Sequence, residues 1–285
     1  MKNPYFIDEP TVISFSGGRT SAYMLHKCLE AHGGKLPEMA KVLFANTGKE
    51  MPETLDFVNE CSDRWNVDIT WIELDNMYRL KDQSTRKVYH WDYKVTDYSN
   101  ASRNGEPFKM LLNASTTIPN SAMRICTSFM KIKPMLRYLK ANGFESPWQV
   151  FIGIRADEER RAVKLHNKYQ EGQDQYCPLY VDGITKKDIY AFWESSPFDL
   201  NLPNNNGTTD FGNCDLCFLK GKRKRMSIIK ARPDLADWWI KAEKDRGEQF
   251  RPDEISYEQM KTSSEQQDDM FADAYDDSIP CFCGD

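Results

Sequence analysis

The sequence contains no apolar run that approaches the roughly 20 residues a membrane-spanning helix needs, which speaks against an integral membrane protein. Its first residues, MKNPYFIDEP, carry acids where a secretory signal needs an apolar stretch, so export by that route is not expected. Positive charge is not in excess either. Lys and Arg number 38 against 43 Asp and Glu, a net charge of −5, so no chain-wide basic surface attracts nucleic acid. We therefore expect a cytoplasmic protein that does not contact membranes.

Two common nucleotide-binding motifs are also absent. The chain has no G-x-x-x-x-G-K-[ST], and no G-x-G-x-x-G follows an expected strand. These absences exclude an ordinary P-loop ATPase and an enzyme that binds NAD through the usual fingerprint.

What is present is the composition of a globular protein. Hydrophobic residues make up 40% and aromatic residues 12% of the 285 positions, which excludes disorder along the whole chain. The length corresponds to one large domain with an appendage. Eight cysteines in a chain without an export signal are expected to be reduced, metal-bound or catalytic rather than paired in disulfides.

Short apolar runs alternate with stretches of helical spacing. The expected strands are residues 11–15, 41–45, 67–74 and 148–154, and the helices between them include one that Pro52 opens. Such alternation predicts an α/β fold, a parallel sheet with helices on both faces. Residues 76–122 show no sustained period and are expected to form a long excursion over the functional edge. Thr185 and Asp188 are expected to form a capping box.

A glycine turn between the first strand and the first helix is the leading candidate site. Its residues are Ser14, Ser16, Gly17, Gly18, Arg19, Thr20 and Ser21. Backbone N–H groups at a helix N-terminus converge on one point and suit a phosphate or sulfate. The alternative is a tight turn with capping serines and no ligand.

Four segments, in order, carry a family resemblance. The run SFSGGRTS resembles the PP-loop, SGGxDS, of the adenine-nucleotide α-hydrolase superfamily. NTGKEMPET, from Asn46, resembles DTGxxFPET of the phosphoadenylyl-sulfate (PAPS) reductase family. Arg124-Ile125-Cys126 with KIKP, GIRADEERR from Gly153, and Cys214-Asp215-Leu216-Cys217 resemble further motifs of that family. The chain is therefore similar to PAPS reductases.

The resemblance implies a Rossmann-like (HUP-type) fold with a five-stranded parallel sheet that binds an adenylyl nucleotide (PAPS, APS or ATP) at the strand C-termini. Residues 1–200 would form the nucleotide-binding domain, with an insertion at about 76–122. Residues 201–285 would form a helical, cysteine-bearing and basic region with an acidic tail. The expected binding residues are Ser14, Ser16, Gly17, Gly18, Arg19, Thr20, Ser21, Asn46, Thr47, Gly48 and Arg155. Arg19 and Arg155 are expected to face the ligand and to stabilise the departing charge.

The cysteines divide into two groups. Cys28, Cys61 and Cys177 are expected to pack in the interior. Cys214 and Cys217 form a C-x-x-C that can chelate one metal, and the resemblance adds Cys126. The fourth ligand is expected to be Cys283, with Cys281 as the alternative. A [4Fe-4S] cluster is favoured on family grounds and zinc is second. In a third arrangement, one tail thiol is a ligand and the other is the nucleophile.

Departures from the motifs leave three functions open. Thr20 replaces the acid of SGGxDS, Asn46 the acid of DTG, and Ile125 a cysteine. In a reductive reaction, Cys283 or Cys281 attacks the sulfonate of PAPS or APS, and a thiol or thioredoxin-like protein supplies electrons. In an activating reaction, ATP adenylates an acceptor on tRNA, DNA or a small molecule, and the basic run at 220–225 holds the nucleic acid. The third option is a non-catalytic nucleotide-binding module with structural zinc.

Overall fold

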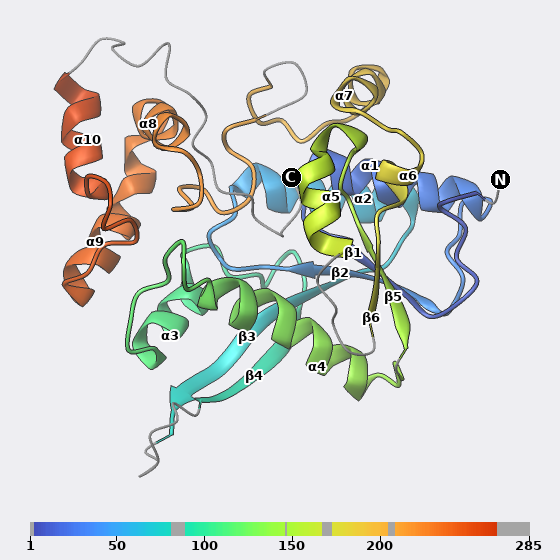
Figure 1. Ribbon diagram of the computed structural model, residues 1–285, viewed down its shortest axis with the longest axis horizontal. Helices are drawn as coiled ribbons and strands as arrows, with labels where there is room; N and C mark the ends of the chain where they lie inside the picture. Colours follow the sequence, from blue (N-terminus) through green and yellow to red (C-terminus); the bar gives the residue numbers. More distant parts are fainter. Residues whose placement is uncertain (1–2, 81–88, 146, 167–172, 205–208, 267–285) are drawn as a thin grey trace.

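The computed structural model describes residues 3–80, 89–145, 147–166, 173–204 and 209–266, and its centre is a six-stranded sheet. The strands lie in the order β4-β3-β2-β1-β5-β6 (Figure 1). Their bounds are β1 Thr11–Phe15, β2 Ala40–Ala45, β3 Ile69–Arg79, β4 Tyr89–Thr96, β5 Trp148–Ile152 and β6 Gln173–Tyr176. Every pairing is parallel except that of β3 with β4. The predicted α/β class is confirmed.

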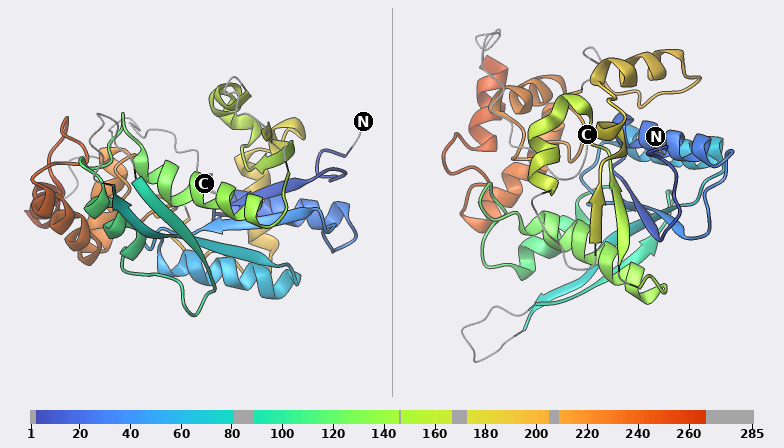
Figure 2. Two further views of the ribbon diagram at one scale, coloured as in Figure 1. Left: turned by 90° about the horizontal axis from the view of Figure 1, so that it is seen from below. Right: turned by 45° about the vertical axis from the view of Figure 1, so that its right-hand side comes forward.

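Helices cover both faces of the sheet, as the alternation predicted (Figure 2). The α-helices are α1 Arg19–Ala31, α2 Pro52–Trp65, α3 Glu106–Ala114, α4 Lys133–Ala141, α5 Glu159–His166, α6 Pro178–Val181, α7 Lys186–Ser195, α8 Lys222–Ala231, α9 Ala236–Arg246 and α10 Tyr257–Gln266. Shorter helical turns are η1 Thr127–Ile132, η2 Ala156–Glu158 and η3 Pro233–Leu235. Among the described residues, none of these helices has the length and apolar character needed to cross a membrane.

Successive side chains of β1 point alternately to the two faces of the sheet. Ile13 and Phe15 point to the core that α1 and α2 cover, whereas Val12 points to a second cluster with Leu139 of α4. Because both faces are covered, the central strands are apolar on both sides.

Two expectations about the sheet are wrong. The sheet has six strands rather than five, and β4 is antiparallel. Residues 76–122 are not a structureless excursion, because β3 extends to Arg79, β4 returns beside it, and α3 follows. The long pairing of β3 with β4 satisfies backbone groups that an extended loop would leave to water.

Of the C-terminal helices, α10 packs against α8 and α9, at the left of Figure 1. Phe108 of α3 contacts Trp238 and Trp239 of α9 through edge-to-face ring contacts at 5.2 and 5.5 Å, and Phe250 at 6.2 Å. The aromatic cluster fixes the C-terminal helices against the carboxyl edge of the sheet.

The turn after β1 provides a first test. Gly17 has φ of +81°, and a Cβ there would lie 2.7 Å from Cγ2 of Thr54 on α2. Gly33 has a similar φ of +66° but no atom within 4 Å of its added Cβ. We expect Gly17→Ala to lower the free energy of unfolding by roughly 1 to 3 kcal/mol more than Gly33→Ala, because only Gly17 adds overpacking to backbone strain. Equal losses in urea unfolding would contradict the close packing of this turn on α2.

Candidate functional site

The glycine turn after β1 ends at Gly18, the N-cap of α1. Its side chains are ordered by short hydrogen bonds: the hydroxyls of Ser16 and Ser21 lie 2.9 Å apart, and the Ser21 hydroxyl also donates to the Gly18 carbonyl at 2.9 Å. The first-turn N–H groups of α1 have no acceptor within the helix. The turn therefore has a form that an anion could occupy, and binding of an anion there stays a prediction.

Arg155 reaches this turn from the end of β5. Gly153 allows the close approach, since a Cβ there would lie 3.3 Å from Cα of Ser21. Nη1 of Arg155 donates to the Thr20 hydroxyl at 3.3 Å, and Nε donates to Asp157 at 3.0 Å. The structure thus brings Arg155 and the glycine turn together.

Arg19 has a different environment from the one expected. Its guanidinium makes two 2.6 Å hydrogen bonds to the Asp199 carboxylate and a third, at 3.2 Å, to the Leu202 carbonyl, and only 5% of the residue is exposed. A buried guanidinium with a bidentate carboxylate partner has its charge satisfied. We place Arg19 as an anchor between α1 and the segment after α7, and not against a ligand.

In the loop after β2, the polar side chains also hydrogen-bond to other residues of the protein. The Asn46 amide donates to Glu73 at 2.6 Å and to the Ser102 carbonyl at 2.8 Å, and its oxygen accepts from the Gly48 N–H. The hydroxyl of Thr47 donates to Glu50. Asn46 and Thr47 are both buried, so these residues shape the loop, and the expected contact of Asn46, Thr47 and Gly48 with a nucleotide stays a prediction.

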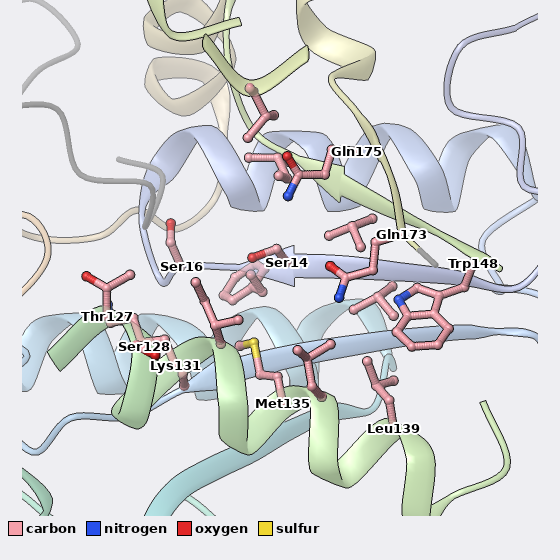
Figure 3. Close-up of a pocket in the computed structure, with 18 of the residues that line it drawn as sticks. Ser14, Ser16, Thr127, Ser128, Lys131, Met135, Leu139, Trp148, Gln173 and Gln175 are labelled. Atoms are coloured by element: carbon pink, nitrogen blue, oxygen red, sulfur yellow. The ribbon is translucent and has the colours of Figure 1, made fainter. Parts of the chain in front are cut away.

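A large cavity of about 510 Å³ opens from the turn along one sheet face, between α4 and strands β1, β5 and β6 (Figure 3). Its end near the turn is polar and is lined by Ser14, Ser16, Arg124, Thr127, Ser128 and Lys131. Its inner end is mainly apolar and is lined by Met135, Leu136, Leu139, Trp148, Val150, Leu165, Gln173 and Gln175, among others. A volume of this size suits a nucleotide-sized ligand.

A second, small cavity of about 20 Å³ gathers the three cysteines that the motifs selected. Cys126, Cys214 and Cys217 line it together with Thr47 and Lys131. Thr127 and Lys131 line both cavities, so the wide π-turn η1 separates them. Burial raises the pKa of the Cys214 thiol well above its usual value.

Three thiols around one cavity are the donors that zinc or an iron-sulfur cluster takes. A volume of about 20 Å³ holds one small atom, however, so a cubane cluster would require these walls to move apart. Within the described ranges, no group of three or more His, Cys, Asp or Glu side chains is arranged to hold a metal ion. Cys281 and Cys283 lie outside the described residues. The three thiols are suitable ligands for zinc or an iron-sulfur cluster, but in the described residues they are not arranged to coordinate a metal ion.

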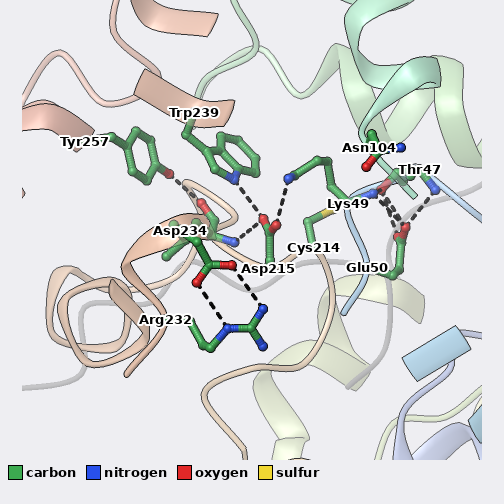
Figure 4. Close-up of polar contacts among 12 residues, drawn as sticks. Thr47, Lys49, Glu50, Asn104, Cys214, Asp215, Arg232, Asp234, Trp239 and Tyr257 are labelled. Carbon is green, nitrogen blue, oxygen red and sulfur yellow. Dashed lines mark hydrogen bonds and ion pairs between the residues drawn. The ribbon is translucent and has the colours of Figure 1, made fainter. Parts of the chain in front are cut away.

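The C-x-x-C turn contacts the loop after β2 through an ion pair and backbone hydrogen bonds (Figure 4). Nζ of Lys49 lies 2.8 Å from the Asp215 carboxylate, and both side chains are almost fully buried. The Asp215 N–H donates to the Lys49 carbonyl at 2.7 Å, and Trp239 Nε1 donates to the same carboxylate at 2.7 Å. Backbone pairing of Glu50 with Cys214 completes the junction.

The remaining cysteines lie away from this junction. Cys28 and Cys61 are in the core as predicted, and burial raises the pKa of both thiols. Cys177 lines a different cavity, and burial raises its pKa to about 11. None of the described cysteines forms a disulfide with another.

Part of the basic run at 220–225 is structural. Arg225 is 1% exposed and pairs with Glu254, and Nζ of Lys220 donates to the Asp215 carbonyl at 2.8 Å. Two of the five cations therefore make internal contacts, and the expected role of the run in holding nucleic acid stays a prediction.

Comparison with known proteins identifies the family of this chain. A family model of the phosphoadenosine phosphosulfate reductase domain matches residues 10–196. The chain belongs to this family.

Three known proteins were found to be similar to this chain to different degrees. The uncharacterized nin region protein ORF290 of Escherichia phage lambda is 31% identical over 213 residues, 75% of this chain and 67% of that protein. The uncharacterized protein MJ0066 of Methanocaldococcus jannaschii is 26% identical over 244 residues, 84% of this chain and 42% of that protein. The U34-tRNA thiolase NcsA from Methanococcus maripaludis, solved with its [4Fe-4S] cluster, is 12% identical, with coverage of 97% and 81% of the two chains and a TM-score of 0.40.

Several cavity residues of this phosphoadenosine phosphosulfate reductase domain were missed as site residues. Arg124 and Lys131 stand in the R-I-C and K-I-K-P motifs, which signalled them. Gln173 and Gln175 had no sequence signal, because β6 is short and polar and was not predicted as a strand.

The buried Lys49 provides the second test. We expect Lys49→Met to lower the free energy of unfolding by about 3 kcal/mol or more, because the Asp215 carboxylate stays buried without its cation. Lys261→Met, which breaks the exposed ion pair with Asp237, is the matched control and is expected to change little. Equal Tm values for the two variants would show that the buried ion pair does not stabilise the C-x-x-C turn against the loop after β2.

Proposed function

We propose that this protein is an enzyme that binds an adenylyl nucleotide in the large cavity and carries out sulfur chemistry at the α-phosphate or at the sulfur attached to it. One observation carries the proposal: the cavity that starts at the glycine turn shares the wall of Thr127 and Lys131 with the cavity of the three cysteines. A nucleotide phosphate at the turn would lie next to sulfur ligands.

The polar end of the cavity suits the phosphate. The hydroxyl of Ser16 and the cations Arg124 and Lys131 line this end, and the first turn of α1 follows directly in the chain. Arg155 lies beside it, where Nη1 donates to the Thr20 hydroxyl while the guanidinium also pairs with Asp157 and Glu158. The apolar inner end suits a flat base. A ligand with both parts, such as PAPS, APS or ATP, matches this gradient from polar to apolar.

Among the reactions considered, we favour reduction of a sulfonucleotide. A thiolate of Cys283 or Cys281 attacks the sulfonate sulfur, an S–S bond forms, the S–O bond to the phosphate breaks, and the adenosine phosphate leaves with its electron pair. A second thiol, from a small molecule or a thioredoxin-like protein, then releases sulfite and forms a disulfide. Arg155 stabilises the charge that develops on the departing phosphate. Lys220 and Arg225 make internal contacts, which weakens the case for transfer to a nucleic acid.

Cys126, Cys214 and Cys217 are the residues that would hold a metal group, and the proposed fourth ligand is the tail thiol, Cys283 or Cys281, that does not act as the nucleophile. A [4Fe-4S] cluster, the first choice, would supply electrons, and zinc would be structural. The three described thiols and Lys131 line the small cavity, which adjoins the polar end of the large cavity.

Incubation of anaerobically purified protein with APS or PAPS and dithiothreitol tests the proposal. We expect release of sulfite and of AMP or adenosine 3′,5′-bisphosphate. Pyrophosphate release from ATP without sulfite formation from either sulfonucleotide would instead indicate the activating reaction. Binding of nucleotides without any product would indicate a non-catalytic module.

Arg155→Ala is expected to lower sulfite release by about tenfold or more, because a charge-assisted hydrogen bond to the departing phosphate is lost. Arg232→Ala is the matched control, since that arginine pairs with Asp234 at the surface. An unchanged rate for Arg155→Ala would remove Arg155 from the site.

Cysteine variants test the metal ligands. Cys126→Ser, Cys214→Ser and Cys217→Ser are each expected to lower metal content, because a thiolate ligand is lost, whereas Cys177→Ser is expected to keep it. Iron, sulfide and zinc analysis with an absorbance spectrum on anaerobic protein measures this. Full metal content in all three variants would contradict the assignment of these ligands. A finding of zinc without iron would show that the site holds zinc instead of an iron-sulfur cluster.

A further inference from the structure

The large cavity extends beyond the reach of a nucleotide held at the glycine turn. Its far end is lined by Leu136, Leu139, Trp148 and Gln173. The backbone N–H of Gln149, next to Trp148, donates to the Pro10 carbonyl at 2.8 Å, so Trp148 lies at about the level of Pro10. Ser16 is six residues further along β1 and the turn, which at about 3.3 Å per residue makes roughly 20 Å. A phosphate, a ribose and a base in line are shorter than this, so they would not fill the far end.

The far end contains a buried donor without a partner. Nε1 of Trp148 has no hydrogen-bond partner among the described residues, and only 3% of this residue is exposed. Figure 3 shows Leu139, Trp148 and Gln173 together at the opposite end of the cavity from Ser16. Buried polar atoms are nearly always paired, so an indole N–H on a cavity wall calls for an acceptor.

The other walls of the far end are apolar or uncharged. Leu139 and Trp148 belong to one buried cluster with Val12 of β1, and Leu136 of α4 packs against it. Among the described lining residues, the charged ones are Arg124 and Lys131, and both belong to the polar end near the turn. Because an unpaired charge is costly to bury, the far end suits an uncharged ligand.

We propose that the far end is a second binding site, which takes a small, uncharged, apolar molecule that carries one hydrogen-bond acceptor, such as an aromatic ketone. Nε1 of Trp148 donates to the acceptor oxygen, and the leucines of α4 contact the apolar body. A mainly apolar pocket with one or two polar groups that fix orientation is the usual form of a small-molecule site. The inference goes beyond the proposed function, because it does not require a nucleotide.

Trp148 is the residue that demands an acceptor. The amide of Gln173, opposite Trp148 on β6, can turn over and offer either oxygen or NH₂, so it adapts to either kind of ligand group. An indole N–H can only donate. A ligand of the same shape without an acceptor leaves this N–H unpaired.

Titration of the full chain with two fluorinated probes, followed by fluorine NMR, tests the site. Para-fluoroacetophenone carries a carbonyl oxygen where para-fluoro-α-methylstyrene carries CH₂, and the two molecules have nearly the same shape. We expect the ratio of ketone affinity to alkene affinity to be about tenfold higher in the wild-type protein than in Trp148→Phe, the size of effect that one buried hydrogen bond gives.

Trp65→Phe is the matched control. This tryptophan of α2 packs with Trp193 and Phe198, away from the cavity, so the ratio is expected to match that of the wild-type protein. Leu136→Phe is a second variant in case Trp148→Phe fails to fold, and it is expected to weaken both probes because the larger ring occupies the far end. Circular dichroism and Tm verify each protein.

The ketone titration is repeated with saturating AMP. Unchanged ketone affinity is expected if the two ligands occupy separate parts of the cavity, whereas competition would show that the nucleotide fills the far end and would overturn a second site. Equal ratios in the wild-type protein and Trp148→Phe, or no binding of either probe at millimolar concentrations, would also overturn it. Failure of AMP itself to bind would count against the proposed function, and the titration without AMP would still decide the second site.

Discussion

The buried ion pair of Lys49 with Asp215 is the contact on which the candidate site depends. Lys49 follows β2 and Asp215 lies inside the C-x-x-C, so a 2.8 Å contact joins the sheet to a segment more than 160 residues later. Trp239 donates to the same carboxylate and connects it to α9. Two charges removed from water must satisfy each other, which gives this junction little freedom. The cysteines therefore have a fixed position beside the carboxyl edge of the sheet.

The second determinant of the site is the π-turn η1, which precedes α4 without a break. Turns of this kind are wider than an α-helical turn and are often found at functional positions. Here Thr127 and Lys131 face the nucleotide-sized cavity and the cysteine cavity from the same turn. A reaction that transfers a phosphate-bound group to a thiol requires the phosphate site and the thiols to lie next to each other.

Motif residues serve two different purposes in this structure. Ser14, Ser16 and Arg155 are at or beside the large cavity, whereas Arg19 and Asn46 use their polar groups to hold loops in shape. A motif in a single sequence does not distinguish these roles. Direct contact with a ligand and support of the loop that makes the contact both require particular side chains, and only the partners of each side chain separate the two.

The features that depend on neighbours a few residues apart could be predicted from local sequence patterns. These are the alternation of strands and helices, the start of α2 at Pro52, the capping box of Thr185 and Asp188, and the glycine turn before α1. Tertiary structure alone decided the return of β4 beside β3, the pairing of Arg19 with Asp199, and the position of the Trp148 indole N–H at the far end of the large cavity. The physical reason is that each of these features depends on side chains or strands brought together by packing, whose energies no local pattern records.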